Sequence, residues 1–308
     1  MSFDDARMMT TPDGRTLEVR DSGPEDGFPL VFHWGTPSAA VPVPFLEEPA
    51  RERGLRLIAY SRPGYGESMP RPDGRDSATV ADDVADTATI LDQLGIDAFV
   101  TIGWSGGGPR ALGCAALLPE RCRAAASVAG IAPPDGIDWD FWEGMAEENV
   151  GEFTAAFDGP DALEEFLAGQ AGYFAATGEE LGEALGGLAP EADRAALSPA
   201  VADVLAASFR GAGLQGIVGW RDDDLLLLRR SWGFDLGSIQ VPVAVWAGSV
   251  DTMVPFSQGQ WLASHVAGAR AHLLEGEGHI SLITDAGRIL DDLVELAGLT
   301  DLKPGPEH

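Results

Sequence analysis

The sequence predicts an α/β fold with a mostly parallel central sheet, flanked by helices and interrupted by a helical insertion. Short runs rich in Val, Ile and Leu alternate with helical patterns before residue 134 and again after residue 231, which is typical of β-α-β units. Residues 134–231 contain helical stretches punctuated by Gly and Pro, with no convincing strand. We therefore expect a core formed by residues 1–133 and 232–308 and an inserted helical cap over residues 134–231.

The first part of the core predicts five strands and two helices. Thr16–Arg20 alternates between apolar and polar residues and is expected at a sheet edge. Continuous apolar runs suit strands covered on both faces; they are Pro29–His33, Leu55–Tyr60, Ala98–Gly103 and Ala124–Val128. The helical spacing of apolar residues predicts helices at Thr79–Leu94 and Pro109–Leu118.

In the insertion, Trp139–Phe157 predicts a helix with Trp142, Met145, Ala146 and Phe153 at helical spacing. The side chains of such an aromatic stripe more often pack within the protein than line a pocket. An inserted cap must nevertheless lie over part of the core, so some of these side chains are candidates for contact with a substrate. The second part of the core predicts a strand, a helix, a strand and a closing helix, at Val241–Ala247, Ser257–Val266, Arg270–Leu274 and Ile283–Ala297. Residues 303–308 have no period and are expected to form a mobile tail.

The charge balance excludes one class of partner. The chain carries 49 acidic and 20 basic side chains, a formal net charge of −29, and Lys303 is its one lysine. Nucleic acids and anionic membranes are therefore not expected as partners, because both require a positive surface. Residues 134–200 hold 16 acids and one base, Arg194. The cap is thus expected to disfavour anionic substrates and to favour neutral or cationic ones.

Other features point to a cytoplasmic protein without cofactor. Cys114 and Cys122 are the two cysteines, and their spacing fits neither a disulfide framework nor a metal site. The first residues lack the cations and apolar stretch of a signal peptide, and no 18-residue uncharged apolar run follows. No His or Cys cluster has ligand spacing, so we expect no metal and no cofactor.

Ser105 is the candidate nucleophile. It lies in Gly103-Trp-Ser-Gly-Gly107, between a predicted strand and a predicted helix. A serine hydroxyl needs a turn that exposes it, a base that takes its proton and amides that stabilise the oxyanion. A tight strand-to-helix turn with small flanking residues meets the first need. The alternative is a helix N-cap in a glycine-rich turn, because the bare motif arises easily in a glycine-rich chain.

Two further residues follow in the order that a catalytic triad requires. Asp251 comes just after the strand Val241–Ala247, and His279 comes after the strand Arg270–Leu274. Loops at the carboxyl ends of parallel strands meet at one edge of a sheet, so the three side chains are expected to converge there. An ordinary turn residue is the alternative for Asp251, with Asp135 or Asp138 as substitutes.

These motifs give the chain a resemblance to α/β-hydrolase-fold serine hydrolases with a helical cap, in the group of esterases and proline-iminopeptidase-like enzymes. The resemblance covers nearly the whole chain and is carried by five segments: Phe32–Pro37, Ser61–Ser68, Gly103–Gly107, Gly248–Pro255 and Gly278-His279. It implies a triad of Ser105, His279 and Asp251, and no cofactor.

The resemblance also implies an oxyanion hole made by backbone amides. In the family, the loop after the third strand carries His-Gly-x-Pro, and x donates an amide. Here Gly35-Thr36-Pro37 matches, but Trp34 precedes the glycine and His33 lies one place earlier. We expect the N–H groups of Thr36 and Gly106 to form the hole. Structural support is the expected role of His33.

The predicted function is hydrolysis of an ester or related acyl bond of a small, uncharged to moderately apolar molecule through an acyl-enzyme. One alternative is a proline-iminopeptidase-like aminopeptidase, in which cap carboxylates hold a substrate ammonium group. Another is a ligand receptor that keeps the hydrolase fold without turnover. Carbon–carbon bond cleavage and cofactor-free oxidation also stay open, and the sequence indicates neither the substrate nor the oligomeric state.

Overall fold

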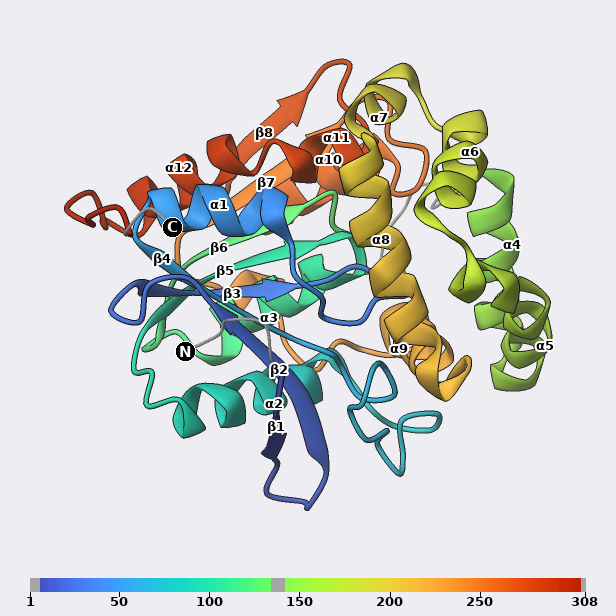
Figure 1. Cartoon of the computed structure of the whole chain (residues 1–308), viewed down its shortest axis with the longest axis horizontal. Coiled ribbons are helices and arrows are strands. Elements are labelled where there is room, and N and C mark those ends of the chain that lie inside the picture. Colours follow the sequence, from blue (N-terminus) through green and yellow to red (C-terminus); the bar gives the residue numbers. More distant parts are fainter. Residues whose placement is uncertain (1–5, 134–141, 306–308) are drawn as a thin grey trace.

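Eight strands form one sheet in the computed structural model, which describes residues 6–133 and 142–305 (Figure 1). Their order across the sheet is β1-β2-β4-β3-β5-β6-β7-β8. β2 is antiparallel to β1 and β4, and all other neighbours are parallel. The strands are β1 (Arg7–Thr10), β2 (Thr16–Ser22), β3 (Phe28–His33), β4 (Leu55–Tyr60), β5 (Phe99–Trp104), β6 (Cys122–Val128), β7 (Val243–Gly248) and β8 (Arg270–Leu274). The predicted mostly parallel α/β sheet is confirmed.

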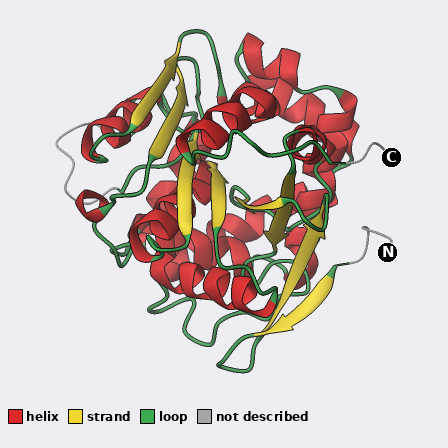
Figure 2. Ribbon diagram, turned by 90° about the vertical axis from the view of Figure 1, so that its left-hand side faces the viewer, coloured by secondary structure: helices red, strands yellow, loops and turns green. Residues whose placement is uncertain are grey.

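Helices cover both faces of the sheet, as Figures 1 and 2 show. Successive residues of β3 explain why: Leu30 and Phe32 enter one buried cluster, and Val31 enters the other. Side chains alternate between the faces of a strand, so a continuous apolar run needs cover on both sides. One face carries α1 (Pro44–Glu52) and α12 (Ala286–Leu296), and the other carries α2 (Val80–Gln93), α3 (Gly108–Leu117) and α10 (Phe256–His265).

The chain between β6 and β7 is helical, and its described residues contain no strand. In Figure 1 these helices lie beyond the end of the sheet to which the β3 arrow points. We call α4 to α9 the helical segment. Its members are α4 (Glu147–Asp158), α5 (Pro160–Gln170), α6 (Gly178–Leu188), α7 (Glu191–Ala196), α8 (Pro199–Ala212) and α9 (Val218–Leu228). Because it lies beyond that end of the sheet, the helical segment faces the loops that follow the parallel strands.

One strand prediction is wrong in its position. Thr16–Arg20 was expected at a sheet edge, but β2 pairs with β4 on one side and with β1 on the other. The edge is β1, which has four residues and buries only Met9. So short and exposed a strand has too little apolar pattern to be predicted from sequence.

Helix boundaries differ from the expectations at three places. The helix predicted from Trp139 begins at Glu147, because Gly144 adopts a φ of 86° in the turn before it; residues 139–141 lie outside the described part. The predicted closing helix divides at Asp285 into α11 (His279–Thr284) and α12. α1, with prolines at its first position and in its interior, was not predicted.

The predicted tail lies partly against the core. The Gly305 N–H donates to the carbonyl of Arg51 at 2.8 Å, so the described end of the chain is fastened to α1. Residues 306–308 lie outside the described residues.

Candidate active site

Ser105 directly follows the central strand β5, on a short turn that leads into α3. Its φ of 56° lies in the left-handed region that residues other than glycine rarely adopt. The turn is very tight: a Cβ on Gly103 would lie 2.1 Å from the Gly107 carbonyl oxygen, and a Cβ on Gly107 would lie 2.1 Å from that of His33. Ser105 thus has the strained strand-to-helix geometry that exposes a serine hydroxyl.

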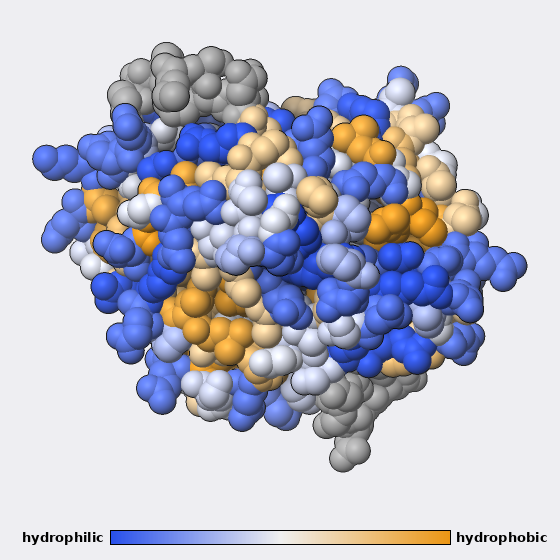
Figure 3. Space-filling view, turned by 90° about the horizontal axis from the view of Figure 1, so that it is seen from below, coloured by the Kyte–Doolittle hydropathy of each residue, from blue (hydrophilic) through white to orange (hydrophobic). Residues whose placement is uncertain are grey.

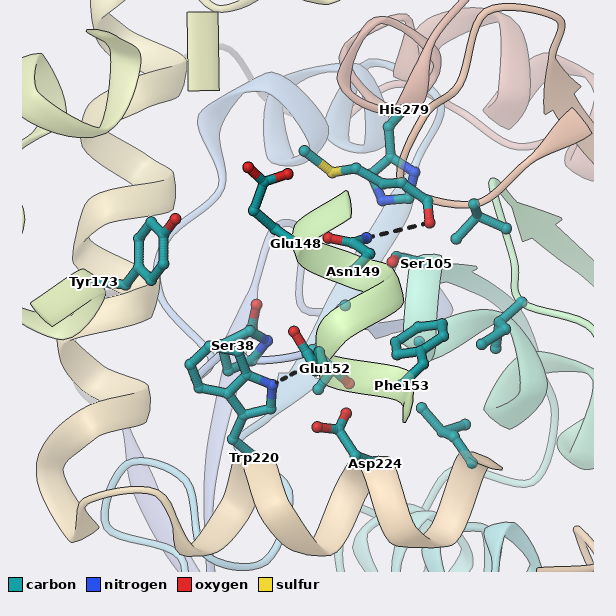
Figure 4. Close-up of a pocket in the computed structure, with 18 of the residues that line it drawn as sticks. Ser38, Ser105, Glu148, Asn149, Glu152, Phe153, Tyr173, Trp220, Asp224 and His279 are labelled. Atoms are coloured by element: carbon teal, nitrogen blue, oxygen red, sulfur yellow. Dashed lines mark hydrogen bonds between the residues drawn. The ribbon is translucent and has the colours of Figure 1, made fainter. Parts of the chain in front are cut away.

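Asp251 and His279 come from different loops and meet beside the pocket. His279 Nδ1 lies 2.8 Å from Asp251 Oδ2, and the two side chains are 4% and 1% exposed. The other Asp251 oxygen accepts the N–H groups of Met253 and Val254 at 2.8 and 2.9 Å, which fixes the carboxylate. Nε2 of His279 is then the ring nitrogen left for Ser105, and Figure 4 places the two side chains at the same end of the pocket.

Opposing effects set the pKa of His279. Burial lowers it, but the charge and hydrogen bond of Asp251, together with the charge of Asp193, raise it above its ordinary value. A histidine that gains a proton more readily is suited to take one from a hydroxyl.

The loop after β3 lies against the serine turn. A Cβ on Gly35 would lie 3.2 Å from the Ser105 Cβ, and a Cβ on Gly106 would lie 2.5 Å from Thr36 Oγ1. Thr36 and Gly106, the two predicted amide donors, therefore lie next to Ser105, and all three line one pocket. Two N–H groups from adjacent segments are the usual means of stabilising an oxyanion in acyl transfer.

Arg62 holds this loop, which explains how Trp34 is accommodated. Trp34 is 1% exposed and packs against Phe32 with ring centroids 5.2 Å apart. The Arg62 guanidinium donates to the carbonyls of Trp34 and Gly35 at 2.7 and 2.8 Å. An arginine on the loop after β4 thus fixes the backbone that leads to Thr36. The sequence placed Arg62 in Ser61–Ser68, one of the segments that carry the family resemblance, but indicated no partner for it.

Asp223 on α9 joins the helical segment to both loops. It accepts from Arg62 and Tyr65, from Arg110 at 2.6 Å and from the Thr36 hydroxyl at 2.8 Å. Burial raises the pKa of Asp223, but the charges of Arg110 and Arg62 outweigh burial and hold that pKa below its ordinary value. Arg110, with no exposed surface, also donates to the Gly106 carbonyl. This network was not predicted from the sequence. The signal that could have indicated it is the acidic run at residues 222–224 inside an apolar helix.

Asp193 on α7 holds the backbone of the candidate base. One of its oxygens accepts the His279 N–H, and the other accepts the N–H groups of Ile280 and Ser281, all at 2.9 Å. Asp193 is 1% exposed. A carboxylate from the helical segment thus satisfies the free N–H groups at the start of α11, as an N-cap would from the same chain segment. Nothing in the sequence indicated this contact.

A pocket of about 200 Å³ opens above Ser105, between the loops of the core and the helical segment (Figure 4). Much of its wall is apolar and aromatic, supplied mainly by Phe153, Phe166, Leu205, Phe209, Trp220 and Leu227. Phe153 belongs to the aromatic stripe expected in the insertion, and Trp142 packs against it with ring centroids 6.1 Å apart. The pocket therefore suits a small molecule with an apolar part.

Other residues that the sequence singled out lie elsewhere. His33 is 2% exposed and is not among the described residues that line the pocket. Burial, followed by the charges of Arg62 and Arg110, lowers the pKa of His33 to about 3, so it is neutral. Cys114 is buried 3.7 Å from it, sulfur to Nε2. Asp135 and Asp138, named as substitutes for Asp251, lie outside the described residues.

The described residues contain no group of three or more His, Cys, Asp or Glu side chains arranged to hold a metal ion. Within the same part of the chain, no helix combines the length and apolar character needed to cross a membrane.

Comparisons with known proteins agree with this fold. A family model described as alpha/beta hydrolase fold matches residues 29–286. An esterase from Rhodococcus with a solved structure superimposes with a TM-score of 0.65 at 21% identity, covering 96% of this chain and 99% of that one. At that identity the likeness concerns the fold.

Two curated relatives match part of the chain. A non-heme chloroperoxidase from Streptomyces lividans is 35% identical over 144 residues, which are 44% of this chain and 51% of the relative. A bifunctional esterase/perhydrolase from Acinetobacter calcoaceticus is 34% identical over 131 residues, 41% of this chain and 45% of the relative. The chain thus spans about half the length of these relatives.

Proposed function

Because this chain belongs to the alpha/beta hydrolase fold family, we propose that it is a serine hydrolase that cleaves an ester or related acyl bond of a small molecule. The observation that carries the proposal is the 2.8 Å contact between His279 Nδ1 and Asp251 Oδ2, beside a strained Ser105 in the same pocket. A nucleophile, a base and an acid that orients the base, supplied by three separate segments, are the parts that nucleophilic catalysis requires.

In the proposed reaction, His279 takes the proton of Ser105 as the hydroxyl oxygen attacks the carbonyl carbon. The carbonyl oxygen becomes an oxyanion that accepts from the N–H groups of Thr36 and Gly106. The bond to the leaving group then breaks, and His279 returns the proton to it. Water attacks the acyl-enzyme in the same manner and frees the acid. Asp251 holds the histidine tautomer and stabilises the imidazolium.

The helical segment acts as a cap in this proposal. It supplies much of the apolar wall of the pocket, and it is joined to the reacting groups through Asp223 and Asp193. A closed apolar pocket excludes water, which strengthens the hydrogen bonds to the oxyanion.

Replacement of the nucleophile tests the reaction. Ser105→Ala is expected to lower kcat on p-nitrophenyl esters by about 10⁴-fold to 10⁶-fold, since a triad without its nucleophile keeps little activity. Ser264→Ala, at an exposed position on α10, is the matched control and should match the parent. Near-parental turnover by a folded Ser105→Ala protein on every substrate would refute the proposal.

The names of the two relatives favour a second candidate reaction on the same residues. Hydrogen peroxide can take the place of water at the acyl-enzyme, which yields a peracid and free Ser105. Peracid formation from a carboxylic acid and peroxide should then be measurable, and Ser105→Ala should abolish it together with ester hydrolysis. Normal hydrolysis without peracid formation would exclude this candidate.

The choice of substrate distinguishes the proposed esterase from the aminopeptidase alternative. Parallel assays with p-nitrophenyl acyl esters and prolyl-naphthylamide distinguish an esterase from an aminopeptidase. A receptor without turnover would hydrolyse neither.

A further inference from the structure

A pair of buried acids lies in the pocket apart from the proposed triad. Glu152 comes from α4 and Asp224 from α9, and both line the pocket. Glu152 accepts from Trp220 Nε1 at 2.8 Å. Asp224 is 2% exposed, and its Oδ2 is buried without a hydrogen-bond partner. Buried polar atoms are normally satisfied, so an unpartnered carboxyl oxygen on a residue that lines the pocket points to a missing ligand atom.

The two acids that precede Asp224 on α9 differ from it in their hydrogen-bond partners. Asp222 accepts from Arg221 at 2.7 Å, and Asp223 is held by Arg62 and Arg110. Asp224 is the one member of the run without a basic partner among the described contacts. Its described partner is instead a second acid, Glu152. Two acids of the run are thus hydrogen-bonded to arginines, whereas Asp224 lies against a second acid.

Burial disfavours the charged form of both acids. Burial, followed by the charge and hydrogen bond of Glu152, raises the pKa of Asp224 far above its ordinary value. Burial raises the pKa of Glu152 as well, but hydrogen bonds from Trp220 and Asp224 oppose the rise. A cation placed between the two acids would offset this penalty, because a nearby positive charge favours the carboxylate form.

No lysine or arginine among the described residues of the pocket lining supplies that positive charge. The described lining residues include three acids, Glu148, Glu152 and Asp224, and neither a lysine nor an arginine. An ammonium group has the complementary charge, and its N–H donors match the open oxygen of Asp224. A carboxylate substrate would be repelled.

We propose that Glu152 and Asp224 form a subsite for a cationic amine in the acyl part of the substrate. Because His279 protonates the leaving group, that group lies beside His279. Figure 4 shows the two acids on the other side of Ser105, where the acyl chain extends. The inference rests on the proposed hydrolase function and narrows its substrate class to apolar acyl chains that carry an ammonium group.

A matched ester series tests the subsite. Methyl ω-aminoalkanoates with six to nine chain carbons are each compared with the methyl alkanoate that has CH₃ in place of NH₃⁺, after correction for the hydroxide-catalysed rate. We expect kcat/KM to favour the ammonium ester by about tenfold or more at one chain length, a typical gain for a desolvated charge pair. The double variant Glu152→Gln/Asp224→Asn should bring this ratio near one.

Glu148→Gln is the matched control, because it removes one pocket charge but leaves the pair intact, so the ratio should be kept. A parental ratio near one at every length, or an unchanged ratio in the double variant, would overturn the subsite while leaving the hydrolase function in place.

If no ester is turned over, the hydrolase function fails and binding decides the subsite. In Ser105→Ala, n-hexylammonium should bind at least about tenfold more tightly than 1-hexanol by calorimetry. Equal or weaker binding would overturn the subsite.

Discussion

Ser105, Asp251 and His279 were predicted from the sequence because each follows a predicted strand, and the loops after parallel strands meet at one edge of the sheet. Thr36 was predicted from the Gly-x-Pro pattern. Arg62, Arg110 and Asp223 were not predicted, because hydrogen bonds between side chains distant in sequence leave no local pattern. The residues of the proposed triad are thus easier to find from this sequence than the residues that hold the loops around them.

The pH dependence of activity tests the role of Asp251. His279 must be neutral to take a proton, so kcat/KM should fall as the pH drops through the His279 pKa, which lies above its ordinary value of 6.5. Asp251→Asn removes the charge that raises this pKa. The acid limb of the profile should therefore move to lower pH, and kcat should fall by about 10⁴-fold. An acid limb in the same place would contradict the assignment.

Removal of the charge between the two buried arginines tests the network around Asp223. Asp223→Asn leaves Arg62 and Arg110 short of a counter-charge, and we expect a loss of about 3–5 kcal/mol in the free energy of unfolding. Asp92→Asn, in an exposed ion pair with Arg121, should cost less than about 1 kcal/mol. Urea unfolding measures both, and equal effects would show that the network contributes no more than a surface pair.

Among the elements, long apolar runs were predicted well and short or exposed ones were not. β3 to β7 and the helices α2 and α3 lie close to their predicted ranges, because burial on both faces of a strand or along one stripe of a helix produces a clear pattern. β8 is an exception, since it has its predicted range although none of its residues is buried. β1 and α1 were missed, since the first is very short and the second contains two prolines. The contacts between the helical segment and the core depend on tertiary packing and have no period at all.

α7 connects the helical segment to His279 through Asp193, and this connection can be tested separately. Asp193→Ala leaves three N–H groups at the start of α11 without acceptors, so stability should fall by about 1–3 kcal/mol. Asp193→Asn keeps one acceptor oxygen and removes the charge.

The pH profile distinguishes positioning from general support. Because the charge of Asp193 raises the His279 pKa, the acid limb of Asp193→Asn should move to lower pH, with a lower kcat. A profile identical to that of the parent would indicate that α7 supports the fold alone.

Over the whole molecule, the negative charge is concentrated in one region. Residues 134–200 hold 16 acids and one base, and two helices of this region, α4 and α5, line the pocket. Another face, shown in Figure 3, is largely hydrophilic with separate apolar patches. We therefore expect the excess charge to act on substrate entry as well as on solubility.

Varying the ionic strength tests whether this negative charge affects substrate entry. Cationic esters should lose kcat/KM as salt rises and anionic esters should gain it, because salt screens exposed charges beyond about 10 Å at 0.1 M. A neutral ester of the same size serves as the control and should change little. Equal behaviour of all three esters from low to high salt would make the acidity a solubility feature.

The most direct test of the central claim, that Ser105 is an activated nucleophile, is covalent labelling by a fluorophosphonate probe. Intact mass spectrometry should show one adduct per chain, peptide mapping should place it on Ser105, and His279→Ala should slow its formation by several orders of magnitude. Folded protein that remains unlabelled, or a label on another residue, would contradict the account.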